Sequence, residues 1–449
     1  MPASPARVAA YEILLRVERE GAYAADLLHS SRLARFSDSD KALATELVMG
    51  VLRWRARLDH SLASVCDQPL AKLDLEVLMA LRLGAYQLGY LERVPARAAV
   101  HESVELAKRA KKRSAAPLVN AVLRHLALSG QRKVFHAERP AAEGASVRDI
   151  ADHSSHPLWL VERWERNFGA TAAARICDFD QSVPVTALRL SADVTDDDLR
   201  REGVELAPGA LLTHARRLVS GDVTRSQVLA AGRVAIQDEA SQLVAALVGT
   251  GARILDCCAA PGGKTAGIAE RNPQATIVAA ELHPHRARTL RRRSPGENVS
   301  VIVADALALP LNAEFDRVLA DVPCSGTGTL GRNPEIKWRL EPGAFADLHR
   351  KQLAILRAAL DRVAPGGRLV YSTCSLEPEE NAEVVNEALF SRRGFRLLDC
   401  HDELLKLKAT GELAWDDLDS LTHDGFLQTL PGLHPCDGFF AALLRRETP

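Results

Sequence analysis

The chain has 449 residues, which is more than one ordinary domain holds, so we expect two or three domains. With 47% hydrophobic and 26% charged residues, its composition is that of a globular protein and excludes a disordered one. No stretch approaches the roughly 20 apolar residues of a membrane span, and charged residues interrupt the N-terminal apolar runs where a signal peptide would lie. We therefore expect a cytoplasmic protein.

The eight cysteines form no C-x-x-C pair and show no regular spacing. This arrangement disfavours both a zinc site and a disulfide framework. The 14 histidines likewise lack a spacing typical of metal ligands. We expect no metal.

The net charge of −1 conceals an asymmetry along the chain. Residues 1–135 contain 21 Lys and Arg against 14 Asp and Glu, a net charge of +7, so the remainder carries −8. The run Lys108–Arg113 is densely basic. Such a run is either a solvated helix end or a contact with a phosphate backbone, and charge alone leaves both readings open.

The first 130 residues have helical periodicity without strand-like alternation, which predicts an all-α domain. Ser37 or Asp38 is expected to cap the second helix. The apolar positions that define the expected helices fall at 8–17, 43–52, 75–91, 100–107 and 118–128. A polar stretch from about 129 to 156 follows and is typical of a linker, with one short helix near 147–151.

A small mixed region comes next. A helix is expected at 158–168 and another at 196–202, and strands at 185–190, near Leu206, near Leu218 and at 233–236. This order predicts a small α+β subdomain.

From Glu239 onward strands alternate with helices, which is typical of a parallel sheet covered on both faces. The expected strands are 253–256, 276–281, 299–304, 317–321, 368–372, 395–399 and 439–444, and the main helices are 264–271, 285–293 and 344–363. Seven strands, with an antiparallel one in the last pair, predict a Rossmann-like methyltransferase sheet.

A loop of small residues, Cys258–Lys264, joins the first of these strands to a helix. Such a loop lets backbone N–H groups approach a ligand at the positive end of the helix. It differs from a P-loop because Cys258 stands where glycine is required, and it lacks the G-x-G-x-x-G pattern of nicotinamide enzymes.

Two acids end the next two strands. Glu281 lies where an acid binds ribose hydroxyls in this fold, and Asp305 lies where a side chain can meet an adenine amino group. With no phosphate clamp in the sequence, an adenosyl group bearing an amino acid fits better than a nucleotide. We therefore expect S-adenosylmethionine as cofactor.

Two cysteines follow the ends of two further strands, Cys324 in Asp-Val-Pro-Cys and Cys374 in Ser-Thr-Cys. Beside a bound cofactor, this pair indicates a nucleophile with a helper thiol rather than a disulfide. The remaining cysteines other than Cys258 are expected to be small buried hydrophobes, namely Cys66, Cys177, Cys257, Cys400 and Cys436.

These motifs together resemble the RNA 5-methylcytosine methyltransferases, most closely the bacterial branch that acts on small-subunit (16S) ribosomal RNA. The resemblance covers nearly the whole chain and is carried by residues 256–265, 321–328, 333–338 and 372–375, with further matches at 50–53, 83–88, 119–124, 237–241 and 437–440. It implies a multidomain protein with a NusB-like all-α RNA-binding domain at 1–135. A linker and small α+β subdomain would occupy 136–236, and the α/β Rossmann-like catalytic domain with its seven-stranded sheet 237–449.

The resemblance also implies roles for individual residues. Cys374 would attack C6 of cytosine, Cys324 would help to remove the C5 proton and release the enzyme, and Asp321 would bond the N3/N4 edge of the base. Lys264 and Lys337 would supply positive charge near the thiolate or the RNA. The cofactor would be held by Cys258, Ala259, Ala260, Pro261, Gly262, Gly263, Lys264, Glu281, Asp305 and Asp321.

The departures from the family pattern are small: Cys257 at a variable position, Val322 for a usual alanine and Glu281 where aspartate is commoner. The expected partner is small-subunit ribosomal RNA, free or partly assembled, and we expect a monomer. A transfer RNA substrate stays open. Methylation of an amino group would favour an Asn/Asp-Pro-Pro-aromatic motif in place of Asp321–Cys324, and an RNA-binding assembly factor with a vestigial catalytic half would lack these residues.

Overall fold

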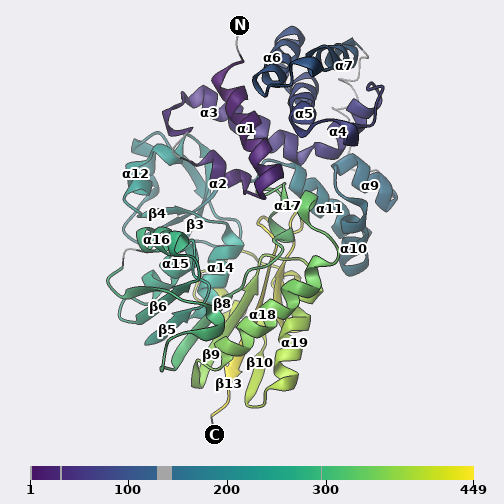
Figure 1. The fold of residues 1–449 in the computed structure, drawn as a ribbon. Coiled ribbons are helices and arrows are strands. Elements are labelled where there is room, and N and C mark those ends of the chain that lie inside the picture. Colours follow the sequence, from purple (N-terminus) through teal and green to yellow (C-terminus); the bar gives the residue numbers. More distant parts are fainter. Residues whose placement is uncertain (1–2, 31–32, 129–143, 295, 449) are drawn as a thin grey trace. The chain divides into compact units, whose positions relative to one another are not determined.

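The computed structural model describes residues 3–30, 33–128, 144–294 and 296–448 (Figure 1). These residues form two compact units, one of residues 1–183 with 330–339 and the other of residues 184–329 with 340–449. Most of the linker expected at 129–156 lies outside the described residues. No helix in the described part of the chain is long and apolar enough to cross a membrane.

The first unit is all-helical, as predicted for residues up to about 130, and the helix expected at 158–168 in the small mixed region belongs to this unit instead. Each predicted helix is present, and α2, α4 and α11 were missed because they are short or weakly periodic. The helices are α1 (Pro5–Glu20), α2 (Ala24–Leu28), α3 (Asp38–Arg53), α4 (Arg55–Ala63), α5 (Leu75–Tyr90), α6 (Ala96–Arg109), α7 (Ala116–Leu128), α9 (Val147–Ser154), α10 (Leu158–Phe168) and α11 (Ala170–Gln181).

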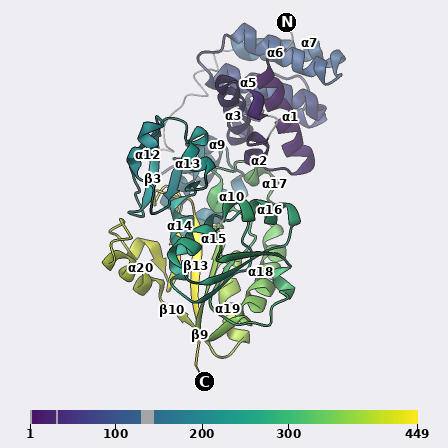
Figure 2. The same cartoon turned by 90° about the vertical axis from the view of Figure 1, so that its left-hand side faces the viewer.

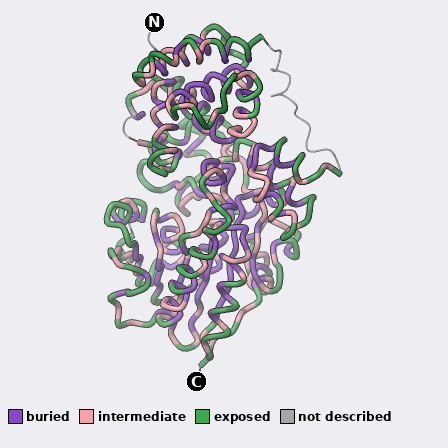
Figure 3. The backbone as a smooth tube through the Cα atoms, turned by 45° about the vertical axis from the view of Figure 1, so that its right-hand side comes forward, coloured by how far each residue is buried: buried purple, intermediate pink, exposed green. Residues whose placement is uncertain are grey.

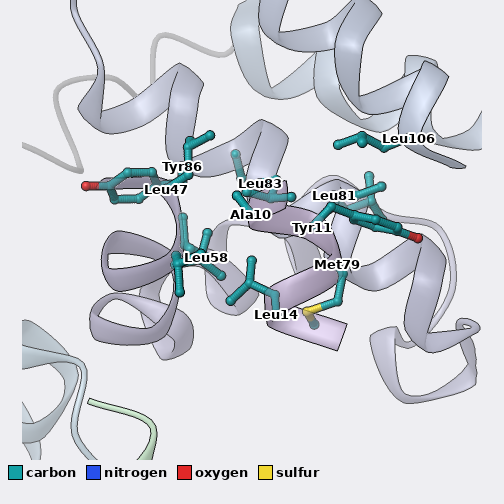
Figure 4. Close-up of a cluster of buried hydrophobic side chains, with 14 of the residues drawn as sticks. Ala10, Tyr11, Leu14, Leu47, Leu58, Met79, Leu81, Leu83, Tyr86 and Leu106 are labelled. Atoms are coloured by element: carbon teal, nitrogen blue, oxygen red, sulfur yellow. The ribbon is translucent and has the colours of Figure 1, made fainter. Parts of the chain in front are cut away.

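The core of this unit is mainly aliphatic, with Tyr11 and Tyr86 among its side chains, and it is formed by α1 to α7 (Figure 4). Leu14, Leu47 and Leu83 are fully buried there. Of the two expected caps, it is the Ser37 hydroxyl that accepts a hydrogen bond from the backbone N–H of Asp40 and caps α3. The apolar side chains that form a stripe along each helix pack against one another in this core.

A segment from the second half of the chain completes the helical unit. Residues 330–339, which include α17 (Ile336–Arg339), belong to it. The Lys337 ammonium donates to the backbone carbonyl of Arg53 at 3.2 Å, and the Trp338 indole N–H donates to that of Leu52 at 2.6 Å.

Lys337, suggested as a source of positive charge near the thiolate or RNA, is buried in the helical unit. Its side chain is 1% exposed, and burial lowers its pKa to about 7. Lys337 is a structural group of the helical unit. The Trp338 indole N–H is likewise bonded within this unit.

The second unit begins with the predicted α+β subdomain. Its four strands are antiparallel in the order β2–β3–β1–β4. The elements are β1 (Ala187–Leu190), α12 (Asp196–Arg201), β2 (Glu205–Pro208), β3 (Ala215–Ser220), α13 (Gln227–Ala230) and β4 (Val234–Ile236).

The large sheet contains all seven predicted strands and two short ones that were missed, β11 and β12. Five strands are parallel in the order β9–β8–β5–β6–β7, and β13 pairs antiparallel with β9. The strands are β5 (Arg253–Asp256), β6 (Thr276–Glu281), β7 (Val299–Val303), β8 (Phe315–Asp321), β9 (Val363–Thr373), β10 (Phe395–Leu398), β11 (Thr422–His423), β12 (Phe426–Thr429) and β13 (Phe439–Arg446).

Helices cover both faces of this sheet (Figure 2). Leu319 and Val370 face α14 (Glu239–Val248) and α20 (Cys400–Ala409) on one side, whereas Val318 and Leu369 face α18 (Ala344–Leu360) and α19 (Ala382–Ser391) on the other. The central strands are accordingly buried (Figure 3). Burial on both faces explains why they are nearly continuous apolar runs in the sequence.

Candidate active site

The small-residue loop joins β5 to α15 (Gly263–Arg271), as predicted. Gly262 has φ of 109°, a left-handed conformation that a side chain rarely adopts. Because β5 lies where the strand order of the parallel sheet reverses, the loop stands at the topological switch point, where ligands bind in open α/β sheets.

A buried carboxyl lies directly behind the loop. Asp256 ends β5 with 1% exposure, and its Oδ2 accepts a hydrogen bond from the Thr265 hydroxyl at 2.7 Å, whereas Oδ1 has no hydrogen-bond partner. Burial raises the pKa of Asp256 to about 7. The sequence analysis did not assign this residue to the site.

The two strand-end acids lie in the expected order. Glu281 ends β6 and is buried, with Oε1 accepting from the backbone N–H of His283 at 2.9 Å. Asp305 follows β7 and is exposed, and its carboxylate accepts from the backbone N–H of Leu307 at 3.0 Å. Both carboxylates are thus fixed at the carboxyl edge of the sheet, on the strands that follow β5.

Asp321 ends β8 at the same edge and is held from two sides. One oxygen accepts from the Lys264 ammonium at 2.7 Å and the other from the Ser372 hydroxyl at 2.7 Å. Burial by itself would lower the pKa of Lys264, but the Asp321 carboxylate raises it above its ordinary value. The structure therefore joins the glycine loop to the strand ends by an ion pair.

The two cysteines predicted to act together lie side by side. Cys324 Sγ and Cys374 Sγ are 3.3 Å apart, and both residues are partly exposed. The contact with Cys374, followed by burial, raises the pKa of the Cys324 thiol. They meet because β8 and β9 are neighbouring parallel strands with Asp321 opposite Ser372.

A buried acid that the sequence analysis missed holds the loops that carry these thiols. Glu380 is fully buried, and its carboxylate accepts hydrogen bonds from the backbone N–H and hydroxyl of Ser325, from the hydroxyl of Ser375 and from the Gln352 amide. Ser325 and Ser375 each directly follow one of the two cysteines. An acid six residues beyond Cys374 was the available signal, but its burial could not be deduced from sequence.

Most of the remaining cysteines are buried as expected. Cys177, Cys257, Cys400 and Cys436 are at most 2% exposed, but Cys66 is only partly buried at the edge of the helical core. Among the described residues, no group of three or more His, Cys, Asp or Glu side chains is arranged to hold a metal ion.

Comparison with known proteins first defines the class, an α/β methyltransferase joined to a NusB-type helical domain. The family of 16S rRNA methyltransferases RsmB/F matches residues 247–445, and the NusB family matches residues 4–128. A crystal structure described as PH0851 has the same fold, with a TM-score of 0.79, 21% identity and coverage of 99% of this chain and 100% of that one. A methyltransferase homologue from Pyrococcus horikoshii gives a TM-score of 0.55 at 26% identity and covers 67% of this chain and 98% of that one.

Full-length relatives then give the family. The probable ribosomal RNA small subunit methyltransferase B of Bacillus subtilis is 34% identical over 462 residues, covering 100% of both chains. A putative methyltransferase of Mycobacterium tuberculosis is also 34% identical, covering 100% of this chain and 98% of its own. The chain belongs to the family of ribosomal RNA small subunit methyltransferases B, and it is a methyltransferase.

Proposed function

We propose that the protein transfers a methyl group from S-adenosylmethionine to C5 of a cytosine in small-subunit (16S) ribosomal RNA. The observation that carries this proposal is the pair of thiols, 3.3 Å apart, at the ends of two neighbouring parallel strands. Cytosine C5 is a weak nucleophile until a thiolate adds at C6. A pair of thiols suits a reaction that needs one group to add and another to assist release.

The residues at the carboxyl edge fit S-adenosylmethionine. The Gly262 turn brings backbone close to a ligand, Glu281 would bind the ribose hydroxyls, and Asp305 would meet the adenine amino group. When bound, the cofactor would supply an electrophilic methyl group. We assign its binding to Cys258–Lys264, Glu281, Asp305 and Asp321.

Cys374 is the proposed nucleophile. Its thiolate forms a bond to C6 and opens the C5–C6 double bond, so that C5 can take the methyl group. Loss of the C5 proton then restores the double bond and expels the Cys374 thiolate. Asp321, held by Lys264 and Ser372, is fixed to bond the N3/N4 edge of the base.

Cys324 is the proposed partner in the release step. Next to Cys374 its pKa is raised, which keeps it a neutral thiol able to donate a hydrogen bond to the attacking thiolate. Once Cys374 has become a thioether, the negative neighbour is gone and the Cys324 proton is held less strongly. The group can then take part in removing the C5 proton.

The proposed RNA-binding part is the basic N-terminal domain, residues 1–135, followed by the linker and small α+β subdomain at 136–236 and the catalytic domain at 237–449. The basic run of the N-terminal domain contributes Lys108 and Lys112, which pair with Glu105 and Asp74, together with the exposed Lys111 and Arg113. We place the protein in the cytoplasm as a monomer, with ribosomal RNA as partner. Transfer RNA is the alternative substrate.

The decisive experiment uses variants in which one cysteine is replaced. Each is incubated with S-adenosylmethionine and unmodified 16S ribosomal RNA and then run on a denaturing gel. Cys374→Ala is expected to give neither methylation nor a covalent complex, because no thiolate adds to C6. Cys324→Ala is expected to accumulate a protein–RNA adduct that withstands denaturant, because release stalls. Transfer RNA in a parallel reaction distinguishes the two substrates.

Cys66→Ala, in the helical unit, is the matched control and should behave as the unaltered protein. An adduct with Cys374→Ala and none with Cys324→Ala would reverse the two roles. Methylation that survives both substitutions would exclude the covalent mechanism.

A further inference from the structure

Four arginines lie in a row across the large sheet. Arg317 on β8 is the register partner of Arg368 on β9, Arg368 is that of Arg445 on β13, and Arg445 is that of Arg396 on β10. Register partners project from the same face of a sheet, and like charges placed directly opposite one another are destabilising. Repetition of one charge on four adjacent strands therefore needs an explanation.

Three of these arginines line a cavity of about 420 Å³. Two residues further along the strands, Leu319, Val370 and Leu443 belong to the core under α14 and α20, so the arginines lie on that same face. The C-terminal end of α14, the α20 residues Glu403, Lys406 and Leu407, and Arg271 at the end of α15 contribute to the lining.

The basic side chains of the cavity outnumber the acids that pair with them. Glu403 is the one acid among its described lining residues, and it pairs with both Arg368 at 2.8 Å and Lys406 at 2.7 Å. The Arg368 fork also donates to the carbonyl of Val248 at the end of α14. Arg271 pairs with Glu412, outside the lining, so no acid of the lining remains for Arg317 and Arg445.

Two hydrogen-bond donors of the arginine row are buried without a partner, which also indicates that the row is incompletely satisfied within the chain. The Nε atoms of Arg317 and Arg368 are buried and make no hydrogen bond. Burial, followed by the charge of Arg368, lowers the pKa of the Arg317 guanidinium. Guanidinium groups that are partly buried and incompletely hydrogen-bonded are destabilising, and an anion in the cavity would offset their charge.

We propose that this cavity binds a phosphate group. Guanidinium forks match the geometry of phosphate oxygens in a bidentate manner, and Arg317 and Arg445 line the cavity with no acid of the lining as partner. Arg368 and Cys374 are six residues apart along and just beyond β9, a span of about 20 Å at ~3.3 Å per residue. The phosphate site is therefore separate from the methyl-transfer site, and its ligand is either an RNA phosphodiester or a small organic phosphate.

Calorimetry of the full chain with inorganic phosphate, at an ionic strength held constant with chloride, tests the site. The unaltered protein should show saturable binding. The double variant Arg317→Gln/Arg445→Gln should bind at least tenfold more weakly, while Arg446→Gln should bind as the unaltered protein does. Arg446 is the matched control because it is the next residue on β13 and pairs elsewhere, with Glu314.

Competition identifies the source of the phosphate. Displacement by a short RNA oligonucleotide assigns the site to the RNA backbone, and displacement by a ribonucleoside monophosphate alone assigns it to a small ligand. If the double variant fails to fold, Arg317→Lys replaces it, since a lysine keeps the charge but loses the fork and should still weaken binding. Absence of saturable binding to the unaltered protein, or equal binding by the variants, overturns the proposal.

Discussion

The two ends of one sheet face differ in how they treat charge. At the carboxyl ends of β8 and β9, Asp321 receives hydrogen bonds from Lys264 and Ser372. At the opposite ends of the same strands, Arg317 and Arg368 lie opposite each other, and apolar side chains separate the two groups. One end is assembled from complementary groups, and the other brings like charges together.

This contrast indicates two kinds of site. Where charges are satisfied within the chain, the groups are rigid before any ligand arrives, as expected of a centre that orients reacting atoms. Where like charges are left facing one another, a ligand of opposite charge gains most by binding. Substitutions at the carboxyl end should therefore remove stabilising contacts, whereas a substitution in the arginine row should remove repulsion.

Glu380→Ala should have the largest effect. It leaves the donors of Ser325, Ser375 and Gln352 buried without their acceptor, which should cost on the order of 3–5 kcal/mol of unfolding free energy. Methyl transfer should fall more than 100-fold because both cysteine loops lose their common anchor. Urea denaturation and a methyl-transfer assay measure the two effects.

Glu379→Ala is the control. It removes a neighbouring carboxylate but keeps the backbone carbonyl of residue 379, to which the His349 ring is hydrogen-bonded. Equal losses in the two variants would mean that Glu380 serves the local helix and not the cysteine loops.

Asp256→Asn should change how stability depends on pH. The Asp256 pKa is raised to about 7, so the folded chain keeps a proton that the unfolded chain loses near pH 4. This group therefore makes the protein progressively less stable as the pH rises from 4 to 7. A difference of three pKa units corresponds to an effect on the order of 4 kcal/mol.

The measurement is the unfolding free energy of both proteins at pH 5 and pH 8. Relative to the unaltered protein, Asp256→Asn should gain stability at the higher pH, because asparagine has no proton to lose. A constant difference between the two proteins would show that Asp256 is ionised normally in the fold.

Much of this architecture could be predicted because it rests on local patterns. Every strand of the predicted seven is present, since apolar runs bounded by turns specify buried parallel strands. The thiol pair could be predicted because Cys374 directly follows β9 and Cys324 lies three residues beyond the end of β8. The short strands β11 and β12, at two and four residues, carry too little periodicity to be recognised.

The parts that could not be predicted depend on tertiary register and burial. The arginine row exists only because β13 runs antiparallel to β9 with Arg445 opposite Arg368, and no local pattern sets that alignment. Lys337 stands in a motif of the catalytic half, yet it is buried in the helical unit. Neither the register of Arg445 with Arg368 nor the burial of Lys337 can be deduced from sequence spacing.

Lys264→Gln should lower the unfolding free energy moderately, because it acts at the carboxyl end of the sheet, where the charges are paired. It removes the cation from Asp321 at a site where the lysine side chain is 13% exposed, which should cost about 1–2 kcal/mol. A double-mutant cycle with Asp321→Asn, followed by urea denaturation, isolates the pair. Additive losses would show that the two groups do not stabilise each other.

Arg445→Gln should have the smallest effect and the opposite sign. It removes one member of the arginine row, so the sheet should become more stable by about 0.5 kcal/mol at low ionic strength. Because Arg445 is exposed, salt should screen the repulsion, and the gain should shrink as the ionic strength approaches 1 M. Urea denaturation in chloride at two salt concentrations measures it, with Arg446→Gln as control. A loss of stability at low salt would mean that groups of the chain itself already neutralise the row, and the two ends of the sheet would then not differ.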